Sequence, residues 1–296
     1  MNHEIEYRVR LFLTKIRLFK YVSYMWKKYL KHKEKINKKK MKKKQIIEIQ
    51  KFGKYAEVKI GRYKIVLDRS EPHDFQMLKI FESGLIYEPE VSSYIMKNLK
   101  LGETFMDIGA NNGYYTVLAA DLVGSSGKII SIEPNPNAFR RLMHNVKFNN
   151  LSNVVTLNVA LSDHDGNAII YLNKGSDDGQ ASLIKSVHVQ SLGEVELKRF
   201  DHLFIDEKIS IVKMDVEGSE INIIKGMENY LKSHKEVKII MEWNPAYRTN
   251  NEFNYLSSLF HIKLLLPDKE SGFKMKKITE FKELFRLCNL LLETKN

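Results

Sequence analysis

The segment from Phe105 to Val117, which reads FMDIGANNGYYTV, constrains the fold more than any other stretch of this chain. Its apolar run ends in an acid, Asp107, and two glycines follow four residues apart, at Gly109 and Gly113. Such glycines let backbone N–H groups and the start of a helix approach a ligand without interference from a Cβ atom. The segment therefore predicts a buried strand, a nucleotide-cofactor turn and a helix. A dinucleotide fingerprint needs three glycines in G-x-G-x-x-G register, so a dinucleotide is not the expected ligand.

A second apolar strand is predicted at Lys128–Ile132, and it ends in Glu133. In nucleotide-binding α/β folds, an acid at the tip of the second strand accepts hydrogen bonds from ribose hydroxyls. Glu133 is therefore the predicted ribose ligand. The alternative is a solvated acid at a strand end, and the glycine turn one strand earlier favours the ribose role.

Strands and helices alternate along the chain. The expected elements are a hairpin at 55–67, helices near 74–81 and 89–99, and core strands at 104–108, 128–132, 154–157, 209–214 and 237–241. This order gives a parallel sheet that binds cofactor and substrate at the carboxyl ends of its strands. Residues 163–200 interrupt this alternation and predict a β insertion or a lid before the strand at 209–214. Strands at 262–266 and 273–278 follow, and then a last amphipathic helix is expected around Phe281, Leu284, Phe285 and Cys288.

The positive charge is concentrated in residues 1–51, which contain 17 Lys and Arg against 4 Asp and Glu, whereas the rest contains 31 against 32. Between Leu11 and Leu30, apolar and basic residues recur on opposite sides at helical spacing, and the lysine run Lys38–Lys44 follows. This pattern predicts a basic amphipathic helix. Basic residues interrupt it too often for a signal peptide or a membrane span. Residues 1–44 could contact an anionic membrane peripherally, bind nucleic acid, or have no partner outside the protein.

We accordingly expect a basic helix and linker at 1–51 and a catalytic domain at 52–296, with a hairpin-and-helix portion at 52–100 and a cofactor-binding core at 101–296. The single cysteine, Cys288, excludes an intrachain disulfide and cysteine-rich zinc sites. No two of the nine histidines lie three to five residues apart, which excludes a helical zinc motif. The expected location is cytoplasmic, with peripheral membrane association as an option.

Four blocks, in their order and spacing, resemble the FkbM family of S-adenosylmethionine-dependent methyltransferases. The blocks are Asp107–Thr116, Ile132–Pro134, Asn158–Asp163 and Lys213–Glu220, with looser matches at Gly84–Glu88 and Gln180–Leu183. The resemblance implies an α/β, Rossmann-like class I methyltransferase fold, with a mostly parallel seven-stranded sheet flanked by helices. It also implies S-adenosyl-L-methionine as cofactor and O-methylation, often of sugar hydroxyls in glycolipids, polysaccharides or natural products. The predicted cofactor-binding residues are Asp107, Gly109, Asn111, Gly113, Glu133, Asn158, Ala160 and Asp215.

Methyl transfer from a sulfonium requires an aligned acceptor oxygen and removal of its proton. Asp215, Glu217 and Glu242 follow the fourth and fifth predicted strands and are the candidate catalytic residues. Glu220 is expected to be a first-turn helix acid favoured by the helix dipole. No metal is expected, and the alternative is Mg²⁺ held by Asp215, Glu242 and Asn244. The segment Asn244–Tyr247 is similar to the N-P-P-Y motif of adenine amino-methyltransferases but lacks its second proline.

The leading hypothesis is an enzyme that methylates a hydroxyl of a glycan, a lipid-linked sugar or a related metabolite near a membrane. In a second hypothesis RNA is the methyl acceptor, and the basic residues 1–51 bind it electrostatically. Residues 52–296, however, carry no excess of basic residues. A third is a catalytically silent, membrane-associated scaffold, which the intact motif residues argue against. No DNA partner is expected.

Overall fold

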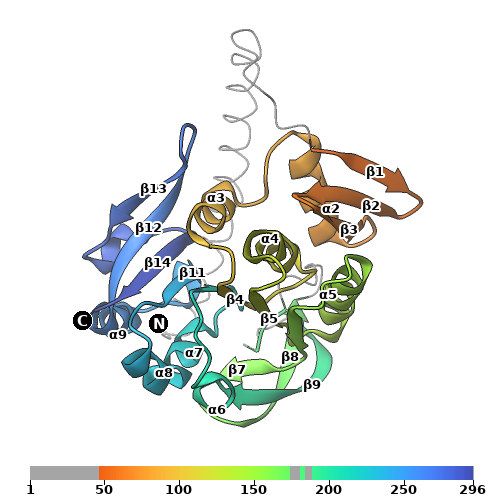
Figure 1. The fold of residues 1–296 in the computed structure, drawn as a ribbon. Coiled ribbons are helices and arrows are strands. Elements are labelled where there is room, and N and C mark those ends of the chain that lie inside the picture. Colours follow the sequence, from red (N-terminus) through yellow and green to blue (C-terminus); the bar gives the residue numbers. More distant parts are fainter. Residues whose placement is uncertain (1–46, 174–180, 184–188, 296) are drawn as a thin grey trace, which may run out of the picture. The chain divides into compact units, whose positions relative to one another are not determined.

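Figure 1 shows the fold in a computed structural model, which describes residues 47–173, 181–183 and 189–295. The expected basic helix and lysine run, within residues 1–44, lie outside this part of the chain. Among the described residues, the largest sheet has eight strands in the order β13-β12-β14-β11-β10-β4-β5-β6. It is a mixed sheet flanked by helices, as the Rossmann-like prediction requires.

Five parallel strands make up one part of this sheet. They are β6 (Val154–Leu157), β5 (Lys128–Ile132), β4 (Thr104–Ile108), β10 (Ile211–Met214) and β11 (Lys238–Trp243). All five predicted core strands are confirmed. Successive side chains point to opposite faces, so Phe105 lies in one hydrophobic core and Met106 in the other. Because both faces are buried, these strands read as continuous apolar runs rather than as alternating ones.

Helices cover both faces of the sheet (Figure 1). One core includes residues of α2 (Pro72–Glu82), α3 (Pro89–Asn98), α4 (Tyr114–Val123) and α5 (Pro136–Phe148). The other includes residues of α6 (Phe200–Phe204), α7 (Glu220–Gly226), α8 (Glu228–Ser233) and α9 (Asn250–Leu259). The sequence predicts one helix where α7 and α8 stand. The chain divides because Gly226 is a weak helix former and Met227, at φ −92° and ψ 2°, departs from helical geometry.

The C-terminal helix prediction is wrong. The chain forms a short 3₁₀ turn, η3 (Phe281–Glu283), and then β14 (Cys288–Thr294), which lies antiparallel between β11 and β12 (Phe260–Asp268). Leu290, Leu291 and Leu292 are fully buried and alternate between the two cores. A short apolar run buried on both faces has no period that separates a strand from a helix. With β13 (Gly272–Lys277), this antiparallel part gives eight strands instead of seven.

Two smaller sheets confirm further predictions. The hairpin is present as β2 (Tyr55–Ile60) and β3 (Tyr63–Asp68), and β1 (Ile49–Phe52) adds a strand that begins before the expected boundary at residue 51. The β insertion predicted at 163–200 is present as β8 (Gly166–Asn173) and β9 (Val189–Arg199). The strand β7 (Ala160–Ser162), just before it, pairs with β9 in the same sheet. Within the described part of the chain, no helix is long and apolar enough to cross a membrane.

Candidate active site

The turn between β4 and α4 is closely packed against its neighbours. Gly109, Asn111 and Gly113 all have positive φ, at 78°, 49° and 88°. A Cβ atom on Gly109 would lie 1.8 Å from the carbonyl oxygen of Asp215, at the end of β10. The backbone N–H of Gly109 also donates to the carbonyl of Ile132, at the end of β5, at 2.9 Å. Both backbone conformation and space therefore require glycine at position 109.

Asp107 lies beneath this turn and does not line the cleft described below. Its Oδ2 accepts a hydrogen bond from Thr116 Oγ1 at 2.8 Å, which ties β4 to the first turn of α4. Its Oδ1 is buried and has no hydrogen-bond partner among the described residues. Burial raises the pKa of Asp107 to about 6. The structure thus gives this motif acid a supporting position with one unsatisfied oxygen.

Glu133 holds the turn from the second strand. Its Oε2 accepts from the backbone N–H of Asn111 and its Oε1 from that of Asn135, each at 2.8 Å. Burial raises the pKa of Glu133 to about 7, against the opposing effect of these two hydrogen bonds. Each carboxylate oxygen has a further lone pair, so the group can also accept from a ligand hydroxyl. The side chain of Asn158 donates to the carbonyls of Glu133 and Pro134, at 2.8 and 3.1 Å, and thereby fixes this loop.

A cleft of about 360 Å³ runs along the carboxyl ends of the parallel strands. Its size is within the range usual for small-molecule sites. The predicted site residues that line it are Gly109, Asn111, Glu133, Ala160, Asp215, Glu217 and Glu242. Four others are not in the lining: Asp107, Gly113, Asn158 and Asn244. Apolar residues such as Leu161 and Ile170 also line the cleft.

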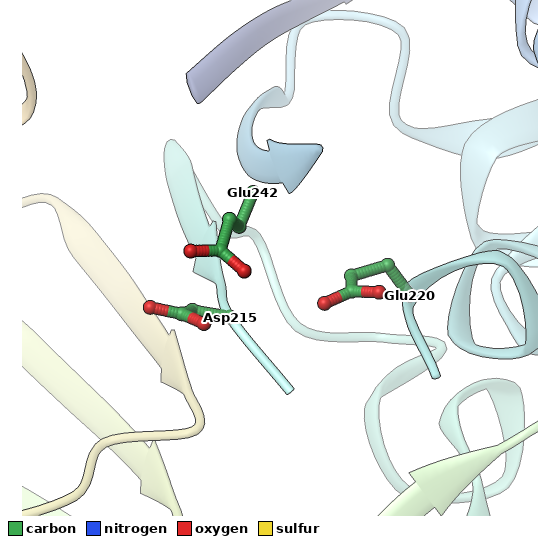
Figure 2. Close-up of side chains that lie close together, drawn as sticks. All are labelled: Asp215, Glu220 and Glu242. Carbon is green, nitrogen blue, oxygen red and sulfur yellow. The ribbon is translucent and has the colours of Figure 1, made fainter. Parts of the chain in front are cut away.

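One end of the cleft is acidic. Figure 2 shows the carboxyl groups of Asp215 and Glu242 directed toward each other, with Glu220 reaching in from the start of α7. Carboxylate oxygens of these three residues lie within 4.8 Å of one another. Burial, and then the negative charge of Asp215, raise the pKa of Glu242 well above its ordinary value. Glu217 follows in the loop after β10 with a positive φ of 52°.

Glu220 and Asn244 have structural partners that limit other roles. Glu220 is buried and paired with Arg248, and its Oε1 accepts from the backbone N–H groups of Val216 and Gly218 at 3.2 and 3.3 Å. Asn244 accepts from the backbone N–H of Ala246 at 3.1 Å and caps a 3₁₀ turn, η2 (Pro245–Tyr247). The third carboxylate near Asp215 and Glu242 is Glu220. The Mg²⁺ alternative stays a prediction.

Sequence reasoning missed three residues that the structure brings to the acidic end. The hydroxyl of Tyr115 donates to Glu88 Oε2 at 2.5 Å, and Lys213 Nζ donates to Asp215 Oδ2 at 2.9 Å. Desolvation raises the pKa of Glu88. All three lie in blocks that carry the family resemblance, so a signal was present. Their roles were not readable because each depends on contacts between separate blocks.

Comparisons with known proteins agree with this geometry. The methyltransferase FkbM domain family matches residues 107–275, and the protein-L-isoaspartate (D-aspartate) O-methyltransferase family matches residues 31–169. The hexuronic acid methyltransferase AglP of Haloferax volcanii is 26% identical over 148 residues, which are 49% of this chain and 59% of that protein.

Two solved structures are also similar. The methyltransferase FkbM of Methylobacillus flagellatus has 14% identity and a TM-score of 0.40, with 74% of this chain and 59% of that chain covered. An S-adenosylmethionine-dependent O-methyltransferase of Thermotoga maritima has 12% identity and a TM-score of 0.41, with 84% and 86% covered.

The sheet, the glycine turn and the acid after the second strand define a class I methyltransferase. Because the FkbM domain match spans more than half of the chain, the protein belongs to the FkbM family of S-adenosylmethionine-dependent methyltransferases.

Proposed function

We propose that this protein transfers a methyl group from S-adenosyl-L-methionine to a hydroxyl of a sugar, in a glycolipid, a polysaccharide or a related metabolite. The observation that carries the proposal is the pair Asp215 and Glu242. These carboxyl groups face each other in the cleft that the glycine turn lines (Figure 2).

The residues around the turn fit the cofactor. Gly109 and Asn111 supply backbone at close range, and Glu133 retains acceptor capacity for ribose hydroxyls. Apolar lining residues such as Ala160, Leu161 and Ile170 suit a purine ring. When bound, the cofactor supplies an electrophilic methyl group. The predicted ligands Asp107, Gly113 and Asn158 act in this proposal by shaping the turn and its loops, not by direct contact.

The acidic end of the cleft suits proton removal from an acceptor hydroxyl. As the methyl group passes from the sulfonium sulfur to the acceptor oxygen, the sulfur–methyl bond breaks and S-adenosylhomocysteine would be left. The hydroxyl proton passes to a carboxylate, for which Asp215 and Glu242 are the candidates. A carboxylate in a desolvated site is a stronger base than one in water, and Glu242 is in such a site. Glu217, also in the lining, is a candidate contact for another hydroxyl of the acceptor.

A sugar acceptor is supported by the printed name of the AglP relative, although the match spans less than two thirds of that protein. RNA is the second candidate acceptor. The cleft carries Glu88, Asp215, Glu217 and Glu242, and such acids disfavour phosphates. The third candidate function is a scaffold without catalytic activity, and the paired acids Asp215 and Glu242 beside the glycine turn do not favour it.

The test uses the purified full chain with S-adenosyl-[methyl-³H]methionine and a panel of neutral glycosides, uronic acid glycosides, lipid-linked sugars and total RNA. We expect label in a sugar-containing acceptor. Asp215→Asn should lower turnover about 100-fold while binding of S-adenosylhomocysteine, measured by calorimetry, is retained. Label in RNA alone would establish the second candidate. Cofactor binding without label in any acceptor would favour the scaffold.

A further inference from the structure

Lys213, the first residue of the block Lys213–Glu220, lies inside the sheet. It is the third residue of β10, whose four residues are all buried, and only 6% of its side chain is exposed. In the sheet register it stands between Asp107 of β4 and Ile240 of β11. A buried ammonium destabilises a fold unless neighbouring charges compensate it. The partners of Lys213 therefore indicate why a lysine is placed here.

The direct partner of Lys213 is Asp215, one of the two candidate proton acceptors. Its Nζ donates to Asp215 Oδ2 at 2.9 Å and lies 5.0 Å from the centre of the Tyr115 ring. The carboxyl groups of Asp215, Glu88 and Asp107 keep the pKa of Lys213 above its ordinary value in spite of burial. Lys213 is therefore an ammonium ion at neutral pH, and it donates rather than accepts protons in hydrogen bonds.

Tyr115 is itself held in place. It is the second residue of α4, directly after the glycine turn, and its hydroxyl donates to Glu88 at 2.5 Å. Glu88 stands before α3 with a φ of 39°, a strained conformation for a residue other than glycine. Such strain persists only where the surroundings impose it. The contacts thus link the start of α3, the start of α4 and β10 in one chain, Glu88–Tyr115–Lys213–Asp215.

We infer that Lys213 is a positioning residue, whose ammonium, supported by Tyr115 and Glu88, holds the Asp215 carboxylate in the direction in which it receives the acceptor's proton. This inference rests on the proposed function. The alternative is that Lys213 only neutralises buried negative charge. If Lys213 positions Asp215, removal of its ammonium lowers turnover and an arginine restores it. If Lys213 only neutralises charge, its removal lowers the stability of the fold instead.

The kinetic test compares Lys213→Met, which keeps the length of the side chain without its charge, with Lys213→Arg, which keeps charge and donors. We expect the methionine variant to lower kcat about 100-fold, with the acceptor KM and the Kd for S-adenosylhomocysteine within about threefold of the parent. The arginine variant should recover about tenfold or more of the loss. The double variant Lys213→Met with Asp215→Asn should have a kcat close to that of Asp215→Asn alone. The two losses are not additive because Lys213 acts only through Asp215. Lys208→Met, at an exposed lysine, is the matched control and should change nothing.

A structural measurement needs no acceptor. Crystal structures of the parent and both variants should show the Asp215 side chain redirected in Lys213→Met and unchanged in Lys213→Arg. The inference is overturned if Lys213→Met keeps this direction, or keeps kcat within about threefold of the parent. If the parent methylates no acceptor, the proposed function fails, and the direction of Asp215 still decides the inference. If Lys213→Met does not fold, Tyr115→Phe replaces it in both tests. This variant keeps the aromatic ring and loses the hydrogen bond to Glu88. The proposed support from Tyr115 is overturned if both kcat and the direction of the Asp215 side chain match those of the parent.

Discussion

At the scale of single residues, Gly109 is the position where the site tolerates least change. Gly109→Ala places a Cβ atom on the Asp215 backbone at a φ of 78°. We expect a loss of about 3 kcal/mol or more in the free energy of unfolding, measured in urea, and loss of S-adenosylhomocysteine binding. Gly53→Ala is the matched control, since Gly53 has a φ of 56° and nothing within 4 Å of its added Cβ. It should cost only about 1 kcal/mol and leave binding intact. Equal losses in both variants would contradict this account of the turn.

The Glu133 carboxyl should make stability depend on pH. Its pKa is raised from 4.5 to about 7 in the folded protein, so between these values the folded state retains a proton that the unfolded state releases. The stabilising contribution is therefore present below pH 4.5 and is lost as the pH rises through about 7, by on the order of 3 kcal/mol. Urea unfolding of the parent and of Glu133→Gln at both ends of this range measures the effect. The glutamine variant should show a clearly smaller fall in the free energy of unfolding. The remainder comes from other acids whose pKa values burial raises, namely Asp107, Glu88 and Glu242. Identical pH profiles would refute the assignment.

At the scale of elements, the sequence predicts what local pattern determines. Continuous apolar runs after glycine or polar breaks give the parallel strands, and the acids that follow them give the cleft lining. Helix α9 was not predicted, although Thr249 and Glu252, which form its capping box, offered a signal in the sequence. Strand β14 was not predictable, since its leucines acquire a strand conformation from pairing with β11 and β12 on both sides. The same limit applies to Lys213, whose role depends on Tyr115 and Glu88 from other elements.

At the scale of the whole molecule, the function of residues 1–44 stays a prediction. We expect them to bring the enzyme to anionic membranes and to be dispensable for folding of the rest. A chain shortened to begin at Ile47 retains all of β1 and should fold and bind S-adenosylhomocysteine. Flotation with phosphatidylcholine vesicles, with and without phosphatidylglycerol, compares it with the full chain. Only the full chain should float with the anionic vesicles, and less so as salt rises. If the shortened chain unfolds, residues 1–44 instead have a structural role.

The place of β14 has a consequence for biosynthesis. Because Cys288–Thr294 pairs with both β11 and β12, the strand that carries Glu242 has no partner on one side until residue 294 has left the ribosome. An unpaired strand edge is a template for association with other chains. A nascent chain that already contains the glycine turn, Glu133 and Asp215 therefore still has an open sheet edge beside the strand that carries Glu242. Translational pausing before Cys288–Thr294 would prolong this vulnerable stage, whereas rapid synthesis of this segment would close the sheet.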